Sequence, residues 1–217
     1  GRYNLVQTLA CEESGAGGYD ASNLNGIFNA GYPDFAYPNL FLSNHDVNRF
    51  GNLIRKKYGY GQENSDYWGR HRAALAFLAA YSGPITVYYG DEVGDIVECY
   101  YRPGDCGAYD DNAARSDGHI SGFNSNQQAL HDFVKKLMKL RSEPPALYEG
   151  RRENQDASGS LYKVDKVSGS ERIQVLINTN SWDYTTVCST GKDLLTGKSY
   201  SKMCHLDPFE VLFLKIN

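Results

Sequence analysis

The first 145 residues contain only two short apolar segments with the character of buried β-strands, and both end in polar residues. Residues 39–43 run directly into an Asn-His-Asp cluster at 44–46, and residues 85–89 run into Gly-Asp-Glu at 90–92. Continuous apolar strands are typical of parallel sheets buried on both faces. Two parallel strands leave both sheet edges open and cannot cover the helices beside them. The sequence therefore predicts either a borrowed partner or the last part of a larger barrel.

Helical patterns surround the two strands. Residues 3–31 are typical of two helical pieces separated by a glycine-rich stretch, and residues 65–81 of one long helix. The segment 93–126 is too long for a simple connection, which indicates a functional loop. A further helix carries apolar residues at helical spacing on one face: Leu130, Phe133, Val134, Leu137 and Leu140.

After Pro145 the pattern changes to short strands separated by turn residues. The strand candidates are residues 161–167, 173–177, 184–188, 200–204 and 209–216. We therefore predict a chain that is α/β in residues 1–145 and all-β in residues 146–217, where the strands form an antiparallel β-sandwich.

Composition and charge exclude two classes of partner. The net charge is −4, from 22 basic and 26 acidic residues without a basic block, which argues against nucleic-acid binding. The longest apolar stretch, residues 73–89, is broken by Ser-Gly-Pro at 82–84, so we expect no membrane span. The 17 tyrosines offer flat faces and hydroxyls suited to sugars, although any one of them is more typical of a core or rim. The chain starts Gly-Arg-Tyr rather than with Met, so we expect it to be processed or cut from a longer protein.

The cysteines allow two disulfides. Cys99 and Cys106 flank one loop, Cys188 and Cys204 lie on neighbouring strand candidates, and Cys11 is left over. Disulfides would imply an oxidising compartment, so the expected location is extracellular or periplasmic. The alternative is five free thiols in a cytosolic protein. The chain has no Cys-x-x-Cys pair and no His/Cys cluster with zinc spacing, which argues against structural zinc.

Four segments in the same order resemble the C-terminal half of the α-amylase family of glycoside hydrolases. Residues 41–46 resemble the end of barrel strand seven, and residues 83–94 resemble strand eight with its Tyr-Gly-Asp-Glu exit. Residues 193–198 and 206–214 resemble the end of the family's C-terminal sandwich. The resemblance implies the C-terminal part of a (β/α) TIM-type barrel followed by the antiparallel β-sandwich.

The resemblance also implies a retaining hydrolysis of α-glucosidic bonds in starch-like glucans. That chemistry needs a nucleophile and an acid/base, with carboxyls about 5–5.5 Å apart. Asp46 matches a third carboxylate, which holds ring hydroxyls and stabilises the transition state. His45 and Asn44 match substrate contacts. Asp111 and Arg115 resemble a pair that grips the sugar, with a local salt bridge as the alternative.

The nucleophile and acid/base motifs of the family do not occur in this sequence. We therefore expect the 217-residue chain alone to be inactive and to need the missing N-terminal half of the barrel. No cofactor is assigned to this chain, since the family's calcium ligands come from upstream segments of the full-length parent. Arg49 receives no role.

Two alternatives to hydrolysis stay open. The first is a transglycosylase or α-glucosidase of the same family, because acceptor choice depends on loops outside this chain. The second is a non-catalytic carbohydrate-binding or partner-subunit protein. For that second reading Trp182 is the candidate stacking platform, although such a Trp is more typical of the sandwich core.

Overall fold

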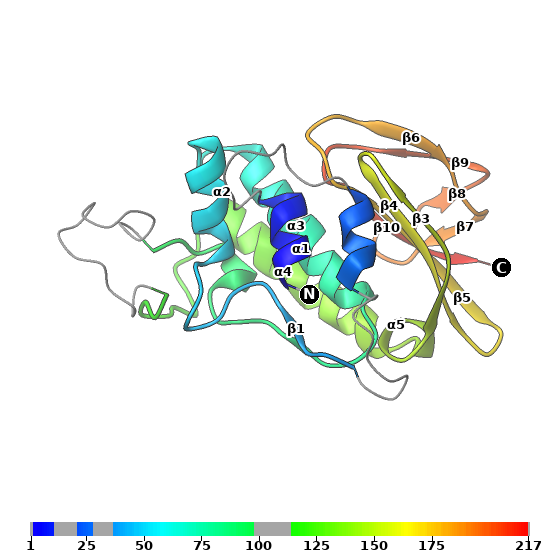
Figure 1. Cartoon of the computed structure of the whole chain (residues 1–217), viewed down its shortest axis with the longest axis horizontal. Helices are drawn as coiled ribbons and strands as arrows, with labels where there is room; N and C mark the ends of the chain where they lie inside the picture. The colour runs from blue at the N-terminus through cyan, green and yellow to red at the C-terminus, as the bar shows by residue number, and fades with distance from the viewer. Residues whose placement is uncertain (1, 11–20, 28–36, 98–113, 217) are drawn as a thin grey trace.

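The structure is a computed structural model that describes residues 2–10, 21–27, 37–97 and 114–216. Helices gather at one end of the molecule and the β-sandwich at the other (Figure 1). The helices are α1 Arg2–Leu9, η1 Ala21–Ile27, α2 Phe50–Tyr58, α3 Ser65–Ala80, η2 Asp91–Val93, α4 Ser125–Ser142 and α5 Pro145–Tyr148. Within these ranges, no helix has the length and apolar character needed to cross a membrane.

The two predicted parallel strands are present and paired. Strand β1, Leu40–Phe41, lies parallel to β2, Ile85–Thr86, with Leu40 opposite Ile85. Each is shorter than the segment that the sequence predicts. In the described part of the chain this pair has no third strand, so neither strand is extended by a ladder on its other edge.

The sandwich consists of a six-stranded and a two-stranded antiparallel sheet. The larger has the order β3-β4-β5-β10-β7-β8, and the smaller pairs β6 with β9. Their bounds are β3 Arg151–Ser158, β4 Leu161–Ser168, β5 Glu171–Asn178, β6 Tyr184–Val187, β7 Gly191–Asp193, β8 Ser199–Tyr200, β9 Met203–Leu206 and β10 Val211–Ile216. The predicted strand 200–204 is divided between β8 and β9, because Lys202 adopts a left-handed turn conformation with φ 62°.

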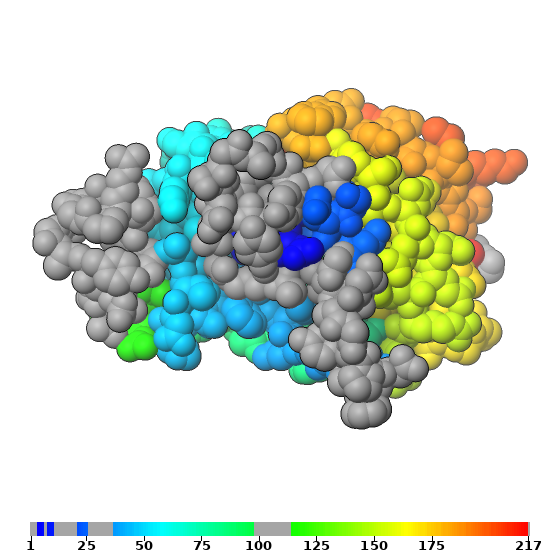
Figure 2. All heavy atoms as spheres, in the orientation of Figure 1, coloured from blue at the N-terminus to red at the C-terminus, as the bar shows by residue number. Residues whose placement is uncertain are grey.

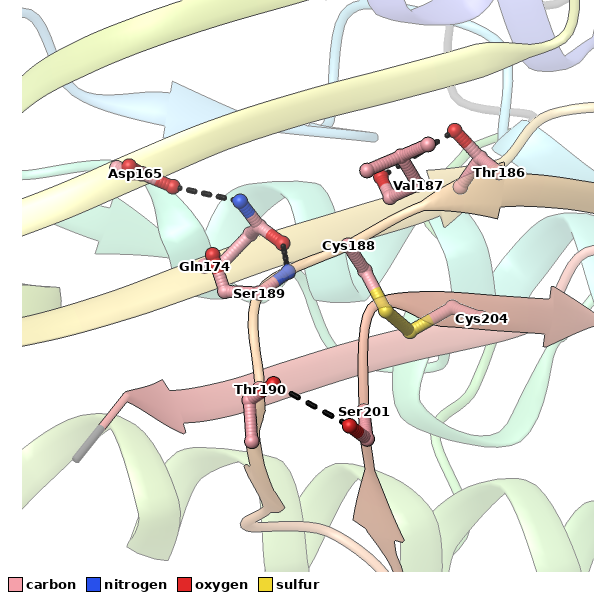
Figure 3. Close-up of a disulfide and its surroundings, with 9 residues drawn as sticks. All are labelled: Asp165, Gln174, Thr186, Val187, Cys188, Ser189, Thr190, Ser201 and Cys204. Atoms are coloured by element: carbon pink, nitrogen blue, oxygen red, sulfur yellow. Dashed lines mark hydrogen bonds between the residues drawn. A yellow bond between two sulfur atoms is a disulfide. The ribbon is translucent and has the colours of Figure 1, made fainter.

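One of the predicted disulfides is confirmed. Cys188, just after β6, is bonded to Cys204 on β9, so the bond links the two strands of the small sheet to each other (Figure 3). Both cysteines are buried. The other predicted pair, Cys99 and Cys106, and the leftover Cys11 lie outside the described residues.

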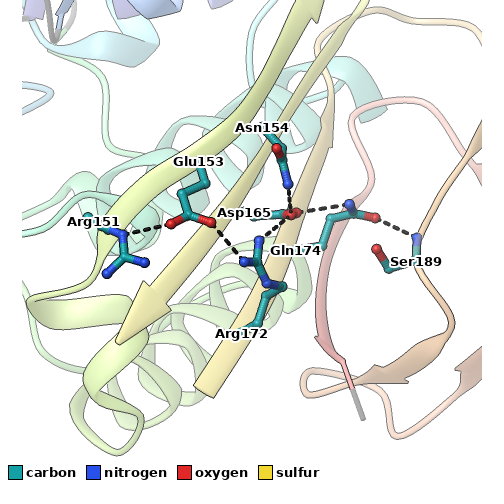
Figure 4. Close-up of polar contacts among 7 residues, drawn as sticks. All are labelled: Arg151, Glu153, Asn154, Asp165, Arg172, Gln174 and Ser189. Carbon is teal, nitrogen blue, oxygen red and sulfur yellow. Dashed lines mark hydrogen bonds and ion pairs between the residues drawn. The ribbon is translucent and has the colours of Figure 1, made fainter. Parts of the chain in front are cut away.

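Strand β3 is polar and largely exposed along most of its length, and it is not among the strands predicted from the sequence. Its position is fixed by the buried carboxylate of Asp165 on β4 (Figure 4). Asp165 accepts hydrogen bonds from Asn154 on β3 at 2.8 Å, from Arg172 at 2.9 Å and from Gln174 at 3.0 Å. Arg172 also donates to Glu153 of β3 at 2.7 Å. Charge-assisted bonds thus hold an edge strand that has little apolar surface to bury.

The helical part and the sandwich share one hydrophobic core. Helix α3 lies between them, and its Phe77 ring meets the Tyr162 ring of β4 edge-on at 5.1 Å. Gly69 permits close contact, because a Cβ at this position would lie 2.7 Å from the ring of Phe209. Helix α5 crosses the predicted domain boundary at 145/146, and the sandwich strands begin at Arg151.

The N-terminal elements pack on the same structure. Figure 2 shows η1, in blue, directly against the yellow surface of the β3 and β4 hairpin. The backbone N–H of Ala21 donates to the carbonyl of Gly159 in the hairpin turn at 2.9 Å. Asn4 of α1 donates to the carbonyl of Asn23 in η1 at 2.7 Å. The N-terminal elements therefore contact each other and the first hairpin of the sandwich.

A buried lysine lies where the helices meet the sandwich. Lys166 of β4 donates to the hydroxyl of Ser82, which donates in turn to the carbonyl of Gly150 at 2.5 Å. Burial, together with the positive charges of Arg152 and Arg141, lowers the pKa of Lys166 to about 7. The lysine loses its charge far more readily here than in the unfolded chain.

We predict that Lys166→Met makes the chain more stable than its parent at pH 6, and that the difference narrows toward pH 9. Below about pH 7 the folded parent must hold a buried charge, whereas between about 7 and 10.5 only the unfolded parent carries the proton. The free energy of unfolding of the parent therefore rises with pH in that window, and the difference between the variants should shrink by about 3 kcal/mol. Urea unfolding at both pH values measures it. Lys135→Met, at an exposed site, is the control, and a pH-independent difference for Lys166→Met would contradict the prediction.

Candidate functional site

The ends of β1 and β2 are joined by a buried carboxylate. Ser43, which follows β1, donates its hydroxyl to Asp91 Oδ1 at 2.6 Å and its backbone N–H to Oδ2 at 3.2 Å. The Ser43 hydroxyl also accepts the N–H of Phe50 at 3.0 Å, where α2 begins. Asp91 opens the short helix η2 after β2. One pair of residues thus fixes both strand exits and the start of a helix.

Asp91 is a buried structural carboxylate rather than a group that meets a ligand. Burial raises its pKa to about 7, while the hydrogen bonds from Ser43 and the charge of Arg49 oppose that rise. A carboxylate without water is stable only where donors surround it. Ser43, after β1, supplies two of those donors to Asp91, which follows β2. The Ser43–Asp91 contact therefore depends on both strand ends.

The predicted cluster at the end of β1 faces solvent. The Asp46 side chain is 65% exposed, and His45 Nε2 lies 3.0 Å from Asp46 Oδ2. Asn44 turns back, and its side-chain oxygen accepts the backbone N–H of Asp46 at 2.8 Å. Asn44 therefore shapes the turn that presents His45 and Asp46 at the open end of the strand pair.

Arg115 comes to the same place from the segment after β2. Its Nη2 atom lies 3.5 Å from Asp46 Oδ1, although the two residues are 69 apart in sequence. The partner that the sequence predicts for Arg115 is Asp111, which lies outside the described residues. The structure thus brings four of the five predicted site residues to one place: Asn44, His45, Asp46 and Arg115.

Arg49 is a further residue of this site, and no role is predicted for it from the sequence. Its side chain is fully buried. It donates to the carbonyl of Tyr89 at 2.7 Å and to the hydroxyl of Ser116 at 3.0 Å. Its guanidinium lies 4.8 Å from the ring centre of Tyr89 and 5.2 Å from that of Tyr88. Arg49 therefore fastens the β2 exit and the following loop to the segment that carries Asp46.

Tyr89 forms the aromatic part of this site. The ring is partly exposed, and its hydroxyl donates to the carbonyl of Ser116 at 2.6 Å. Gly118 lies against the ring, since a Cβ at that position would be 3.0 Å from it. The exposed carboxylate of Asp46, the imidazole of His45, the guanidinium of Arg115 and the ring of Tyr89 thus lie around one end of the β1–β2 strand pair. Such groups can bind the hydroxyls and the flat face of a sugar.

No metal site is visible in the ranges 2–10, 21–27, 37–97 and 114–216: they hold no cluster of three or more His, Cys, Asp or Glu side chains suited to an ion. The expectation that this chain carries no cofactor of its own therefore stays a prediction.

We predict that Ser43→Ala lowers the free energy of unfolding by about 2 kcal/mol, because a buried carboxylate and the Phe50 N–H each lose a partner. Chemical denaturation of the chain measures the loss. Ser142→Ala is the matched control, since that exposed hydroxyl bonds only the carbonyl of Lys139 within its own helix and should cost less than about 0.5 kcal/mol. An equal decrease in the free energy of unfolding for the two variants would show that the Ser43–Asp91 contact is not important for stability.

Comparisons with known proteins agree with this geometry, although no family model matches the sequence. The chain is 32% identical over 155 residues to a beta/alpha-amylase of Paenibacillus polymyxa, which covers 71% of this chain and 11% of that protein. It is 30% identical over 141 residues to a cyclomaltodextrin glucanotransferase of Geobacillus stearothermophilus, covering 65% of this chain and 16% of that protein.

Among solved structures, AmyP in complex with maltose matches all of this chain with a TM-score of 0.91 and 37% identity. The match covers 48% of AmyP, so the chain spans about half of that protein and a smaller share of the curated relatives. The predicted fold class, part of a TIM-type barrel followed by a C-terminal β-sandwich, is confirmed. The chain belongs to the α-amylase family of glycoside hydrolases and corresponds to the C-terminal part of its members.

Proposed function

We propose that this chain supplies the C-terminal part of an enzyme that hydrolyses α-glucosidic bonds of starch-like glucans with retention of configuration. The observation that carries the proposal is the exposed Asp46 carboxylate at the end of a barrel strand, with His45 and Arg115 beside it. The match to AmyP, which was solved with maltose and with maltotriose, supports a glucan as the ligand.

In this proposal Asp46 holds hydroxyls of the reacting sugar ring. A carboxylate that accepts two hydroxyls forms charge-assisted hydrogen bonds, and these strengthen as positive charge develops on the ring. His45 and Arg115 orient the carboxylate and bind neighbouring hydroxyls. Arg49 and Asp91 act as positioning residues, because they are buried and hold the segments that carry the groups facing the sugar.

The nucleophile and the acid/base belong to the N-terminal half of the barrel in this proposal. A retaining glycosidase needs both, close together on opposite sides of the scissile bond. Calcium, if the parent protein uses it, would likewise be held by that half. The Cys188–Cys204 disulfide supports an extracellular or periplasmic location.

A second candidate is transfer of the glucosyl group to another sugar. The specific observation in its favour is the 30% identity to a cyclomaltodextrin glucanotransferase. Both reactions use the same glycosyl intermediate and differ in the acceptor. Products longer than the starting maltooligosaccharide, formed by the full-length protein, would favour transfer over hydrolysis.

We predict that Asp46→Asn in the full-length protein lowers kcat on maltoheptaose by about 10²–10³-fold, because the amide cannot stabilise the developing positive charge. Release of reducing ends measures the rate. Asp132→Asn is the matched control: its side chain on α4 is 65% exposed, as is that of Asp46. An Asp46→Asn enzyme as active as the control would refute the proposed role.

We also predict that the 217-residue chain alone releases no reducing ends from soluble starch, because it lacks the nucleophile and acid/base motifs. The same assay with the full-length protein is the positive control. Hydrolysis by the purified chain, at a rate that Asp46→Asn abolishes, would show that another carboxylate here performs the missing chemistry.

A further inference from the structure

Trp182 is exposed, contrary to the expectation that it belongs to the sandwich core. Its exposed fraction is 56%, whereas Trp68, the other tryptophan of the chain, is 4% exposed. The residue lies in the turn before β6, which starts at Tyr184. An exposed indole is an unusual use of the largest apolar side chain, and such surfaces are typically binding sites.

The sheet that follows Trp182 presents an outward face of its own. Figure 1 shows β6 and β9 on the outer side of the sandwich, away from α3 and α4. Val187 and Met203 lie opposite each other on these strands, and both are exposed. Thr185 and His205 form the next outward pair. The inward side chains include Cys204, whose disulfide fixes the sheet (Figure 3).

The turn that carries Trp182 is held in place by a buried amide. Asn178, which is fully buried, donates to the carbonyl of Trp182 at 2.6 Å and to the carbonyl of Asp207 at 3.0 Å. Its side-chain oxygen accepts the N–H of Asn180 at 3.1 Å. One side chain thus fixes two surface turns relative to each other before any ligand arrives, which lowers the entropy cost of binding.

Polar side chains stand beside the indole. His205 Nε2 lies 3.6 Å from Asp207 and 3.9 Å from Asp183, and its Nδ1 is 3.1 Å from the hydroxyl of Thr185. All four side chains are exposed. The carboxylates repel anionic partners such as nucleic acid or acidic lipid. They can accept hydroxyls from a neutral ligand, and the indole can stack on the flat apolar face of such a ligand.

We propose that Trp182, Asp183, His205 and Asp207 form a second glucan-binding site on the β-sandwich, separate from the strand ends that carry Asp46. Trp182 stacks on one glucosyl ring, and the carboxylates and imidazole bind hydroxyls of that ring and its neighbour. The choice of a glucan as the ligand rests on the proposed function. The evidence for a preformed binding surface is independent of that function, because it consists of the turn held by Asn178 and the exposed indole.

The 217-residue chain carrying Asp46→Asn tests this site, because that change weakens binding at the strand ends. Acrylamide, a neutral quencher, should quench the fluorescence of the exposed Trp182 much more than that of the buried Trp68, and maltoheptaose should protect Trp182 from acrylamide. In the same background, Trp182→Ala should lower the affinity for maltoheptaose by about tenfold in calorimetry, while Trp182→Phe keeps most of it. Tyr148→Ala, at another exposed aromatic residue, is the control and should leave the affinity unchanged.

Two results would overturn the proposal. Either maltoheptaose leaves the quenching of Trp182 by acrylamide unchanged, or a Trp182→Ala chain folds normally and binds maltoheptaose as tightly as the control. A surface that docks a protein instead of a glucan would give the first result.

Experiments on the full-length protein distinguish the second site from the proposed function. If Trp182→Ala reduces adsorption to starch granules and Asp46→Asn keeps full hydrolysis, the second site stands and the proposed function fails. If Asp46→Asn abolishes hydrolysis and Trp182→Ala leaves adsorption to starch granules unchanged, the proposed function stands and the second site fails.

Discussion

The bond between Ser43 and Asp91 is the contact on which the candidate site depends. The two strands pair over only two residues each, so the ladder alone does little to fix their ends. A buried carboxylate that accepts both donors of Ser43 adds a short, directional link at the point where the strands open. Arg49 completes the arrangement from the other side by bonding the carbonyl of Tyr89. With the exits held in this way, Asp46 and Arg115 approach each other across 69 residues of sequence.

Much of this fold could be predicted from sequence, because most elements carry a local signal. The apolar strands and the helix faces follow from periodicity, and the Asn-His-Asp cluster follows from the abrupt change of polarity after residue 43. Strand β3 could not be predicted in this way. Its residues are mostly polar, and it is held by Asp165 and Arg172 from neighbouring strands. Such long-range bonds leave no periodic pattern in the strand that they stabilise.

The residues of the candidate site also differ in whether a local sequence pattern predicts them. Asn44, His45 and Asp46 are contiguous, so a single motif identifies them. The contact of Arg115 with Asp46 depends on the path of the loop after β2, which no local pattern specifies. Arg49 looks like an ordinary surface cation in the sequence, yet it is fully buried against two tyrosines. Trp182 differs from Arg49 in the opposite direction: its apolar character predicts burial, but it is exposed. The reason is the turn that Asn178 holds, which no local pattern predicts.

Three buried ionisable side chains have similar surroundings, because each lies where two structural units meet. Asp91 lies between the exits of β1 and β2, Asp165 between β3 and its neighbours, and Lys166 between the helices and the sandwich. A buried charge adds little net stability, because desolvation offsets most of its attraction to its partners. It does penalise every arrangement in which those partners are displaced. We infer that these charges select one relative placement of the units, while the shared apolar core, which would tolerate small shifts, supplies the stability.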